Sequence, residues 1–124
     1  MPDSFVIPTR QKADVLFQST KPLARFAFYD SPVAEVSGYA RVIILAASDQ
    51  SFGLNIEEAV SVTPAGVGNF VQTDNTILAT LVGSNWQIAT SVLAFGKYMK
   101  MIVGNLGGGA QSFFNFMAKG IPLP

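Results

Sequence analysis

Hydrophobic and polar residues alternate in several short segments of the chain. Phe52, Leu54 and Ile56 stand at every second position with small or polar residues between them, and residues 86–92 keep a similar spacing. A period of two predicts β-strands that have one buried and one exposed face. On this pattern we expect a core that contains Phe26, Phe28, Val42, Ile44, Phe52, Leu54, Ile56, Trp86, Ile88 and Val92.

Groups of turn-forming residues separate these segments at intervals of about 8–12 residues, a spacing typical of a sandwich of short strands. About eight strands are expected, at residues 13–18, 23–30, 41–45, 52–56, 77–82, 86–95, 97–103 and 111–118. Residues 55–62 contain helix-favouring Glu57, Glu58 and Ala59, but their β-branched neighbours favour strand, with at most one helical turn. The sequence therefore predicts an all-β, antiparallel two-sheet sandwich. A jelly roll is the expected topology, and a seven-stranded immunoglobulin-like sandwich is the alternative.

Two segments lack the alternation. Residues 41–45 read Arg-Val-Ile-Ile-Leu, which predicts a strand in the middle of a sheet with both faces covered. Residues 104–109 contain four glycines, but they lack the Lys-Ser/Thr ending of a phosphate-binding loop. We expect these glycines to form a hairpin that joins residues 99–103 to residues 113–116.

The first residues differ from the remainder of the chain. Residues 1–12 have a period of neither two nor 3.6, and they include Pro2 and Pro8, so we expect an extended N-terminal arm before one sandwich domain at residues 13–124. This start does not resemble a secretory signal. The longest strongly apolar stretch, residues 42–47, is far shorter than the roughly 20 residues of a membrane-spanning helix. We therefore expect no membrane partner.

The composition excludes several kinds of chemistry. Eight basic residues balance eight acidic residues, so no net charge attracts the chain to nucleic acid. The chain has no Cys and no His, which excludes thiolate and imidazole metal sites, disulfides, cysteine nucleophiles and serine–histidine relays. We expect a protein that is not an enzyme and that needs no cofactor or metal.

Carboxylates are the remaining catalytic candidates. Glu57 and Glu58 are adjacent, so a strand directs them to opposite faces and they cannot share a site. Asp30, Asp49 and Asp74 lie in turn sequences, where Asp commonly bonds its own backbone. We expect solvated surface carboxylates; the alternatives are a Ca²⁺ site at one of the last two turns and a glycosidase pair.

The aromatic residues allow two interpretations. The alternation around Trp86 places it on a buried face, and this argues against an exposed sugar-binding platform. The three tyrosines either line a groove or reach the wet rim of the sandwich. Phe113 and Phe114 must face opposite sides of one strand, so a second layer or another subunit has to cover at least one of them.

The distribution of charge indicates contacts with other chains. Asp74 is the only charged residue between positions 59 and 96, and interface cores are depleted of charge. We expect this neutral stretch to form contacts between subunits of a homo-oligomer. The arm is expected to bind a larger assembly through its apolar and basic residues, Phe5, Val6, Ile7, Arg10 and Lys12.

Three segments give the chain a resemblance to a known class of proteins. These are Phe-Val-Ile-Pro at residues 5–8, the run from Ser31 to Val42 that leads into an apolar strand, and residues 97–105. With them the chain resembles the jelly-roll capsid decoration, or cement, proteins of tailed bacteriophages. The resemblance implies a structural virion protein without catalytic residues. It would bind the outside of the capsid as a homotrimer, with the major capsid protein as partner, and would be made in the host cytoplasm.

Other classes of protein have a similar pattern of short strands and turns. Tail-fibre, neck and baseplate domains and carbohydrate-binding modules are also small β-sandwiches. A carbohydrate-binding module would need an exposed aromatic platform, and an enzyme would need two carboxylates brought together by the fold.

Overall fold

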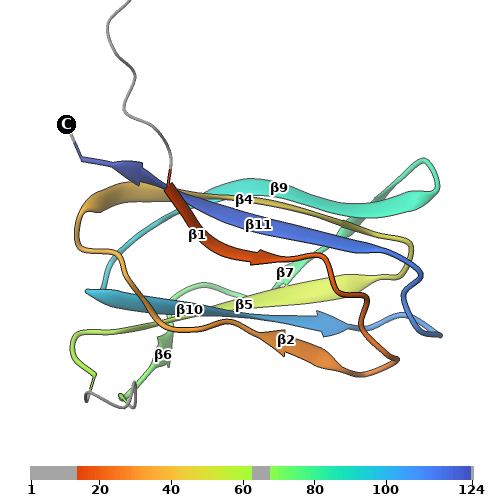
Figure 1. Ribbon diagram of the computed structural model, residues 1–124, viewed down its shortest axis with the longest axis horizontal. Coiled ribbons are helices and arrows are strands. Elements are labelled where there is room, and N and C mark those ends of the chain that lie inside the picture. The colour runs from red at the N-terminus through yellow and green to blue at the C-terminus, as the bar shows by residue number, and fades with distance from the viewer. Residues whose placement is uncertain (1–13, 63–67, 124) are drawn as a thin grey trace, which may run out of the picture.

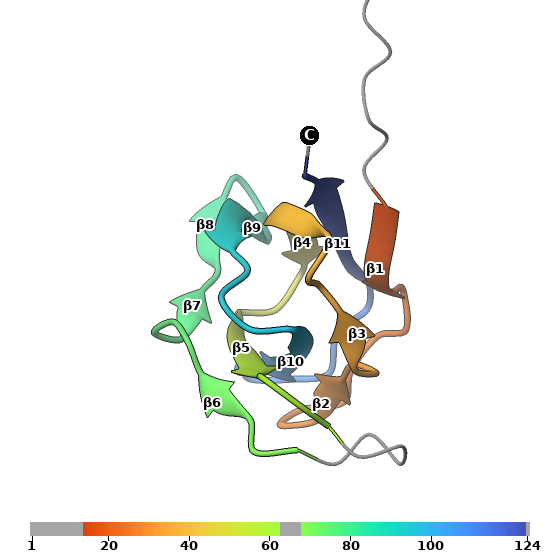
Figure 2. The ribbon, with the colours of Figure 1, turned by 90° about the vertical axis from the view of Figure 1, so that its left-hand side faces the viewer.

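The computed structural model describes residues 14–62 and 68–123, which form eleven strands and contain no helix. The strands are β1 (Asp14–Ser19), β2 (Phe28–Asp30), β3 (Ala34–Glu35), β4 (Tyr39–Ser48), β5 (Phe52–Ala59), β6 (Val71–Gln72), β7 (Ile77–Leu78), β8 (Thr80–Val82), β9 (Asn85–Leu93), β10 (Tyr98–Asn105) and β11 (Phe114–Pro122) (Figure 1). In the end-on view of Figure 2 they form two layers, with β1, β11, β4, β9 and β8 above β2, β10, β5 and β6. The predicted antiparallel sandwich is confirmed.

The order of the strands is that of a jelly roll. The five-stranded sheet has the order β1-β11-β4-β9-β8, and the six-stranded sheet has the order β2-β10-β5-β6, with β3 beside β10 and β7 beside β5. When β3 and β7, which lie off the main path of their sheet, and the edge strand β8 are set aside, eight strands remain; renumbered in chain order, they follow the orders 1-8-3-6 and 2-7-4-5. Chain neighbours thus lie mostly in opposite sheets, as in a double Greek key. The jelly-roll prediction is correct.

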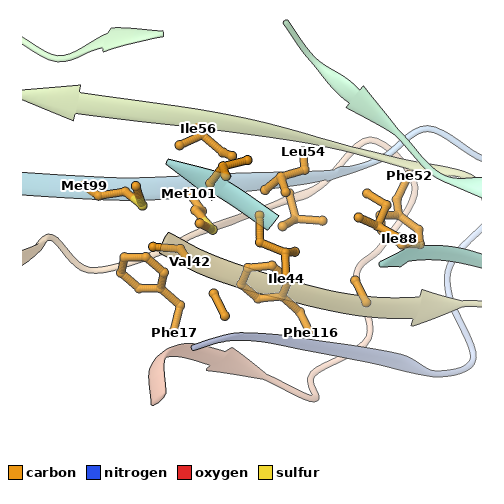
Figure 3. Close-up of a cluster of buried hydrophobic side chains, with 14 of the residues drawn as sticks. Phe17, Val42, Ile44, Phe52, Leu54, Ile56, Ile88, Met99, Met101 and Phe116 are labelled. Atoms are coloured by element: carbon orange, nitrogen blue, oxygen red, sulfur yellow. The ribbon is translucent and has the colours of Figure 1, made fainter. Parts of the chain in front are cut away.

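The core lies between the two sheets and consists mainly of the side chains that point inward, at every second position along the strands (Figure 3). The ring of Phe114 meets Phe52 edge-on at 6.1 Å and stacks with Phe116 at 6.3 Å between centroids. Burial of each such side chain stabilises the fold by roughly 1.5–3 kcal/mol. Seven of the ten predicted core residues are buried: Val42, Ile44, Phe52, Leu54, Ile56, Ile88 and Val92. Trp86 is only half-buried and packs against the edge of this cluster.

Phe26 and Phe28 were predicted to be in the core, and both are exposed. The predicted strand at residues 23–30 forms only over its last three residues, because Phe26 has a positive φ of 63° in a turn. Phe28 then points outward and is paired with Gly104 on β10. A Cβ atom added at Gly104 would lie 2.7 Å from the Phe28 ring, so the ring fills the space above the glycine.

The apolar run in β4 was correctly placed in the middle of a sheet, but only one of its faces is covered. Val42 and Ile44 are buried, whereas Ile43 and Leu45 point to the exposed outer side. No described part of the chain lies over them. On β5, the predicted continuation as a strand is confirmed as far as Ala59.

The glycine-rich segment is not a hairpin. Its flanking strands β10 and β11 lie in different sheets, so residues 106–113 cross from one sheet to the other. The buried side-chain amide of Asn105 organises this crossing, because it donates hydrogen bonds to the carbonyl oxygens of Leu23, Ala24 and Gly109. Its oxygen accepts a bond from the Gly107 amide. The hairpin prediction failed because β10 finds its partners in β2, β3 and β5.

Candidate interaction surface

The outer side of the five-stranded sheet presents a row of side chains that nothing in the described chain covers. We define the β4 face as the outward residues of the three central strands β11, β4 and β9. Four rows of residues paired across these strands make up the β4 face: Ile121, Arg41 and Leu93; Lys119, Ile43 and Ser91; Met117, Leu45 and Ala89; Asn115, Ala47 and Gln87. Leu45 at its centre is 54% exposed.

The β4 face changes in character along the strand direction. Its charged residues, Arg41 and Lys119, stand near one end, and none of its twelve residues is acidic. The Arg41 guanidinium donates to the Ser91 hydroxyl at 2.9 Å and 3.2 Å, which holds it against the sheet. The central row is apolar, and the far row carries uncharged amides. The face is therefore basic at one end, apolar in the middle and neutral at the other end.

A shallow hollow of about 370 Å³ occupies the neutral half of this face. Ala47 and Ala89 leave the space because their side chains are short, while Leu45 and Met117 form the apolar part of the rim. Ile88 and Phe116, which also line the hollow, have side chains buried on the core side of the sheet, and Gln18 and Thr20 add polar groups to the rim. A hollow of this size has room for an aliphatic side chain.

Asp49 follows the neutral end of β4 and anchors the crossing segment before β11. Its carboxylate accepts hydrogen bonds from the Ser112 hydroxyl at 2.6 Å and from the Ser112 amide at 3.0 Å. These bonds, the hydroxyl bond above all, lower the pKa of the Asp49 carboxyl from its ordinary value. The neutral end of the face thus has an anion just beyond it.

Glu58 was expected to be a solvated carboxylate, but the residue is buried, with only 3% of its surface exposed. Its Oε1 accepts hydrogen bonds from the Phe95 and Gly96 amides at 2.7 Å and 2.8 Å, and its Oε2 accepts one from the Thr73 hydroxyl at 2.6 Å. The expectation failed because the donors lie far away in the sequence. Glu58 fastens the β9–β10 loop to β5, and its oxygens are already engaged within the chain.

The outer side of the six-stranded sheet uses its side chains within the molecule. Glu57 pairs with Lys100 at 3.6 Å. Asn55 accepts hydrogen bonds from Thr76 at 2.6 Å and from Gln72 at 3.5 Å. Leu78 and Leu106 lie over Gly53, as Phe28 lies over Gly104.

Two of the three tyrosines, Tyr29 and Tyr39, have partners within the chain. The Tyr39 hydroxyl donates to Asp14 at 2.8 Å, which raises the pKa of the phenol. Tyr29 packs against Phe116 with ring centroids 5.6 Å apart, and burial raises its pKa. Each ring therefore has a structural partner. Of the paired phenylalanines at the start of β11, Phe114 is buried and Phe113 is partly exposed.

The residues predicted to bind a partner, Phe5, Val6, Ile7, Arg10 and Lys12, lie outside the described residues. Within residues 14–62 and 68–123, no group of three or more Asp and Glu side chains is placed to hold a metal ion. The same residues contain no helix long and apolar enough to cross a membrane. The neutral stretch at residues 59–96 does not form one surface, because β6 and β7 belong to one sheet and β8 and β9 to the other.

Comparison of the sequence with models of known protein families and with curated proteins finds no match. The β4 face was missed at the level of sequence, although its signal was present. The run of apolar residues in β4 predicted a strand covered on both sides, and this prediction is wrong for the outer side, where Ile43 and Leu45 are exposed. The fold supplies cover on one side only, and we take the other side as the candidate functional surface.

Proposed function

We propose that this chain is a structural assembly protein, which joins further copies of itself and attaches to a larger protein shell. The proposal rests on one observation, the uncovered apolar β4 face. Exposed apolar residues gathered on one sheet face are typical of protein contact surfaces. Two further features support the proposal. The carboxylates of Glu58 and Asp49 are hydrogen-bonded within the chain, and the chain has no net charge. Both are compatible with binding to protein, which requires no reactive group.

A capsid decoration protein of a tailed bacteriophage is the form of this function that the sequence resemblance favours. In this proposal the shell is the major capsid protein of the virion. Residues 1–12 attach to it, and the sandwich contacts other copies of the chain.

Fractionation of particles tests this proposal. Virions from cells that produce the chain are separated from free protein on a density gradient, and the chain is quantified in each fraction. We expect it in the particle fraction at a fixed ratio to the shell protein. A chain that lacks residues 1–12 should fold and remain with the free protein. Recovery of the full-length chain only outside particles would contradict the proposal.

A carbohydrate-binding module is the second candidate, and it is favoured by the exposed rings of Phe26 and Phe28. Arg25 lies over the Phe26 ring at 4.6 Å, so Phe26 already has a partner within the chain. Binding to a glycan array that is lost in a Phe26→Ala variant would support this candidate over the assembly protein.

A further inference from the structure

The outer side of the five-stranded sheet, which contains the β4 face with β1 and β8 beside it, has the area of a small protein contact. Its strands β1, β11, β4, β9 and β8 contain 6, 9, 10, 9 and 3 residues. At about 4.8 Å between strands and about 3.3 Å per residue they give a footprint of roughly 600 Å². A standard protein interface buries about 800 Å² on each partner. This side of the sheet can therefore supply most of the area of a specific pairing.

The shape of the β4 face is complementary to itself. Ile43 and Leu93 project near the basic end, and the hollow at Ala47 and Ala89 lies towards the neutral end. Position 45 is midway between positions 43 and 47 on the same strand. A two-fold axis at Leu45, with β4 of the two copies antiparallel, therefore places Ile43 of each copy over the hollow of the other.

The same axis also relates opposite charges. In this arrangement Arg41 of one copy lies over the neutral end of the other copy's β4, which ends at Ser48 and is followed directly by Asp49. A parallel arrangement about the same position would instead place Arg41 opposite its own counterpart, and like charges oppose association. The distribution of charge thus selects the antiparallel arrangement.

We propose that the β4 face binds the β4 face of a second copy of this chain, with the two β4 strands antiparallel about a two-fold axis at Leu45. This inference rests on the proposed assembly function and specifies its contact between subunits. A contact that uses the same patch on both subunits closes as a pair. The sandwich therefore forms a two-fold dimer in place of the trimer that the sequence resemblance implies.

Cysteine cross-linking tests this arrangement cleanly, because the chain has no cysteine of its own. Packed sheets lie about 10 Å apart, which is too far for a disulfide and requires a short bismaleimide linker. The test variant is Leu45→Cys at the proposed axis. The matched control is Leu78→Cys, an equally small change at a leucine that is 64% exposed on the other sheet.

We expect Leu45→Cys to form a covalent dimer at micromolar concentration, at least about tenfold more than Leu78→Cys, because the contact raises the effective thiol concentration. In a mixture of Ile43→Cys and Ala47→Cys, these two variants should link to each other more than either links to itself. Melting curves of all variants should match that of the unmodified protein, which shows that they are folded.

Two results would overturn the arrangement. One is an equal yield of covalent dimer from Leu45→Cys and Leu78→Cys. The other is preferential linking of Ile43→Cys to itself, which indicates parallel strands. Since these experiments use purified chain, they fail or succeed independently of whether the chain is found in particles.

Discussion

The two outer faces of this sandwich have similar alternating strands but use their outward apolar residues differently. On the six-stranded sheet, Phe28 and Leu78 lie over glycines of neighbouring strands, and an ion pair joins Lys100 to Glu57. On the five-stranded sheet, Leu45 and Ile43 cover no glycine and have a shallow hollow beside them.

This difference shows that exposure alone does not identify a binding surface. Phe28 is 65% exposed, more than Leu45, yet its ring completes its own sheet. An exposed apolar residue that fills a local gap is accounted for by folding. One that fills nothing in its own chain requires another explanation, and a partner that excludes water from it supplies one.

The largest effect expected concerns the six-stranded sheet, where neighbouring positions on β5 have opposite roles. Glu58→Ala leaves two backbone amides and a hydroxyl without their acceptor, and we expect a loss of roughly 3–5 kcal/mol in the free energy of unfolding. Glu57→Ala removes an ion pair near the surface and should cost less than about 1 kcal/mol. Urea unfolding measures both, and equal losses would show that Glu58 is not a structural clamp.

A smaller effect compares the two outer faces directly. Phe28→Ala uncovers Gly104 and should reduce the free energy of unfolding by about 1–2 kcal/mol in spite of the exposure of the ring. Leu45→Ala should change the stability of the separated monomer by less than about 0.5 kcal/mol. Chemical denaturation at low protein concentration gives both values. A larger loss for Leu45→Ala would reverse the contrast between the faces.

The smallest effect concerns pH and Asp49, beyond the end of the β4 face. Its folded pKa is lowered, so its bonds to Ser112 stabilise the protein above the ordinary carboxyl pKa of about 3.9. That contribution is lost as the pH falls through the lowered value. At neutral pH, Asp49→Asn should lower the free energy of unfolding by under about 1 kcal/mol, since the group is close to solvent. On acidification, the stability of Asp49→Asn should fall less than that of the unmodified protein.

Ser112→Ala removes the main donor to Asp49 and is the matched variant for this measurement. Thermal melting between pH 2 and pH 7 should give the same altered acid profile for both variants. An acid profile identical to that of the unmodified protein would exclude these bonds as its cause.

Local alternation predicted much of the fold because the inward residues of β5 and β9 keep a period of two, and the continuous apolar run of residues 42–45 predicted the central strand β4. It failed at Phe26 and Phe28, where a turn with positive φ shifts the phase and the partner glycine lies on a distant strand. The sheet assignment of β10 and β11 is also a property of long-range pairing. Sequence patterns report which side of a strand is apolar, whereas tertiary structure decides what covers it.

The candidate site illustrates the same limit. The apolar residues at positions 43 and 45 led to the prediction that both faces of the strand are covered, but in the described chain the outer face is open. The sequence pattern shows that a face is apolar and does not show what lies over it. The burial of Glu58 was missed because Thr73, Phe95 and Gly96 approach it only in the folded protein.

Sedimentation velocity tests most directly the central claim that the β4 face is the contact between copies. The samples are the unmodified protein, Leu45→Asp and Leu78→Asp, each over a range of micromolar concentrations. A carboxylate at the proposed axis would face its own counterpart in a dry contact, so Leu45→Asp should sediment as a folded monomer. The unmodified protein and Leu78→Asp should sediment as dimers. A Leu45→Asp variant that sediments as the unmodified protein does would contradict the assignment of the β4 face as the contact between copies.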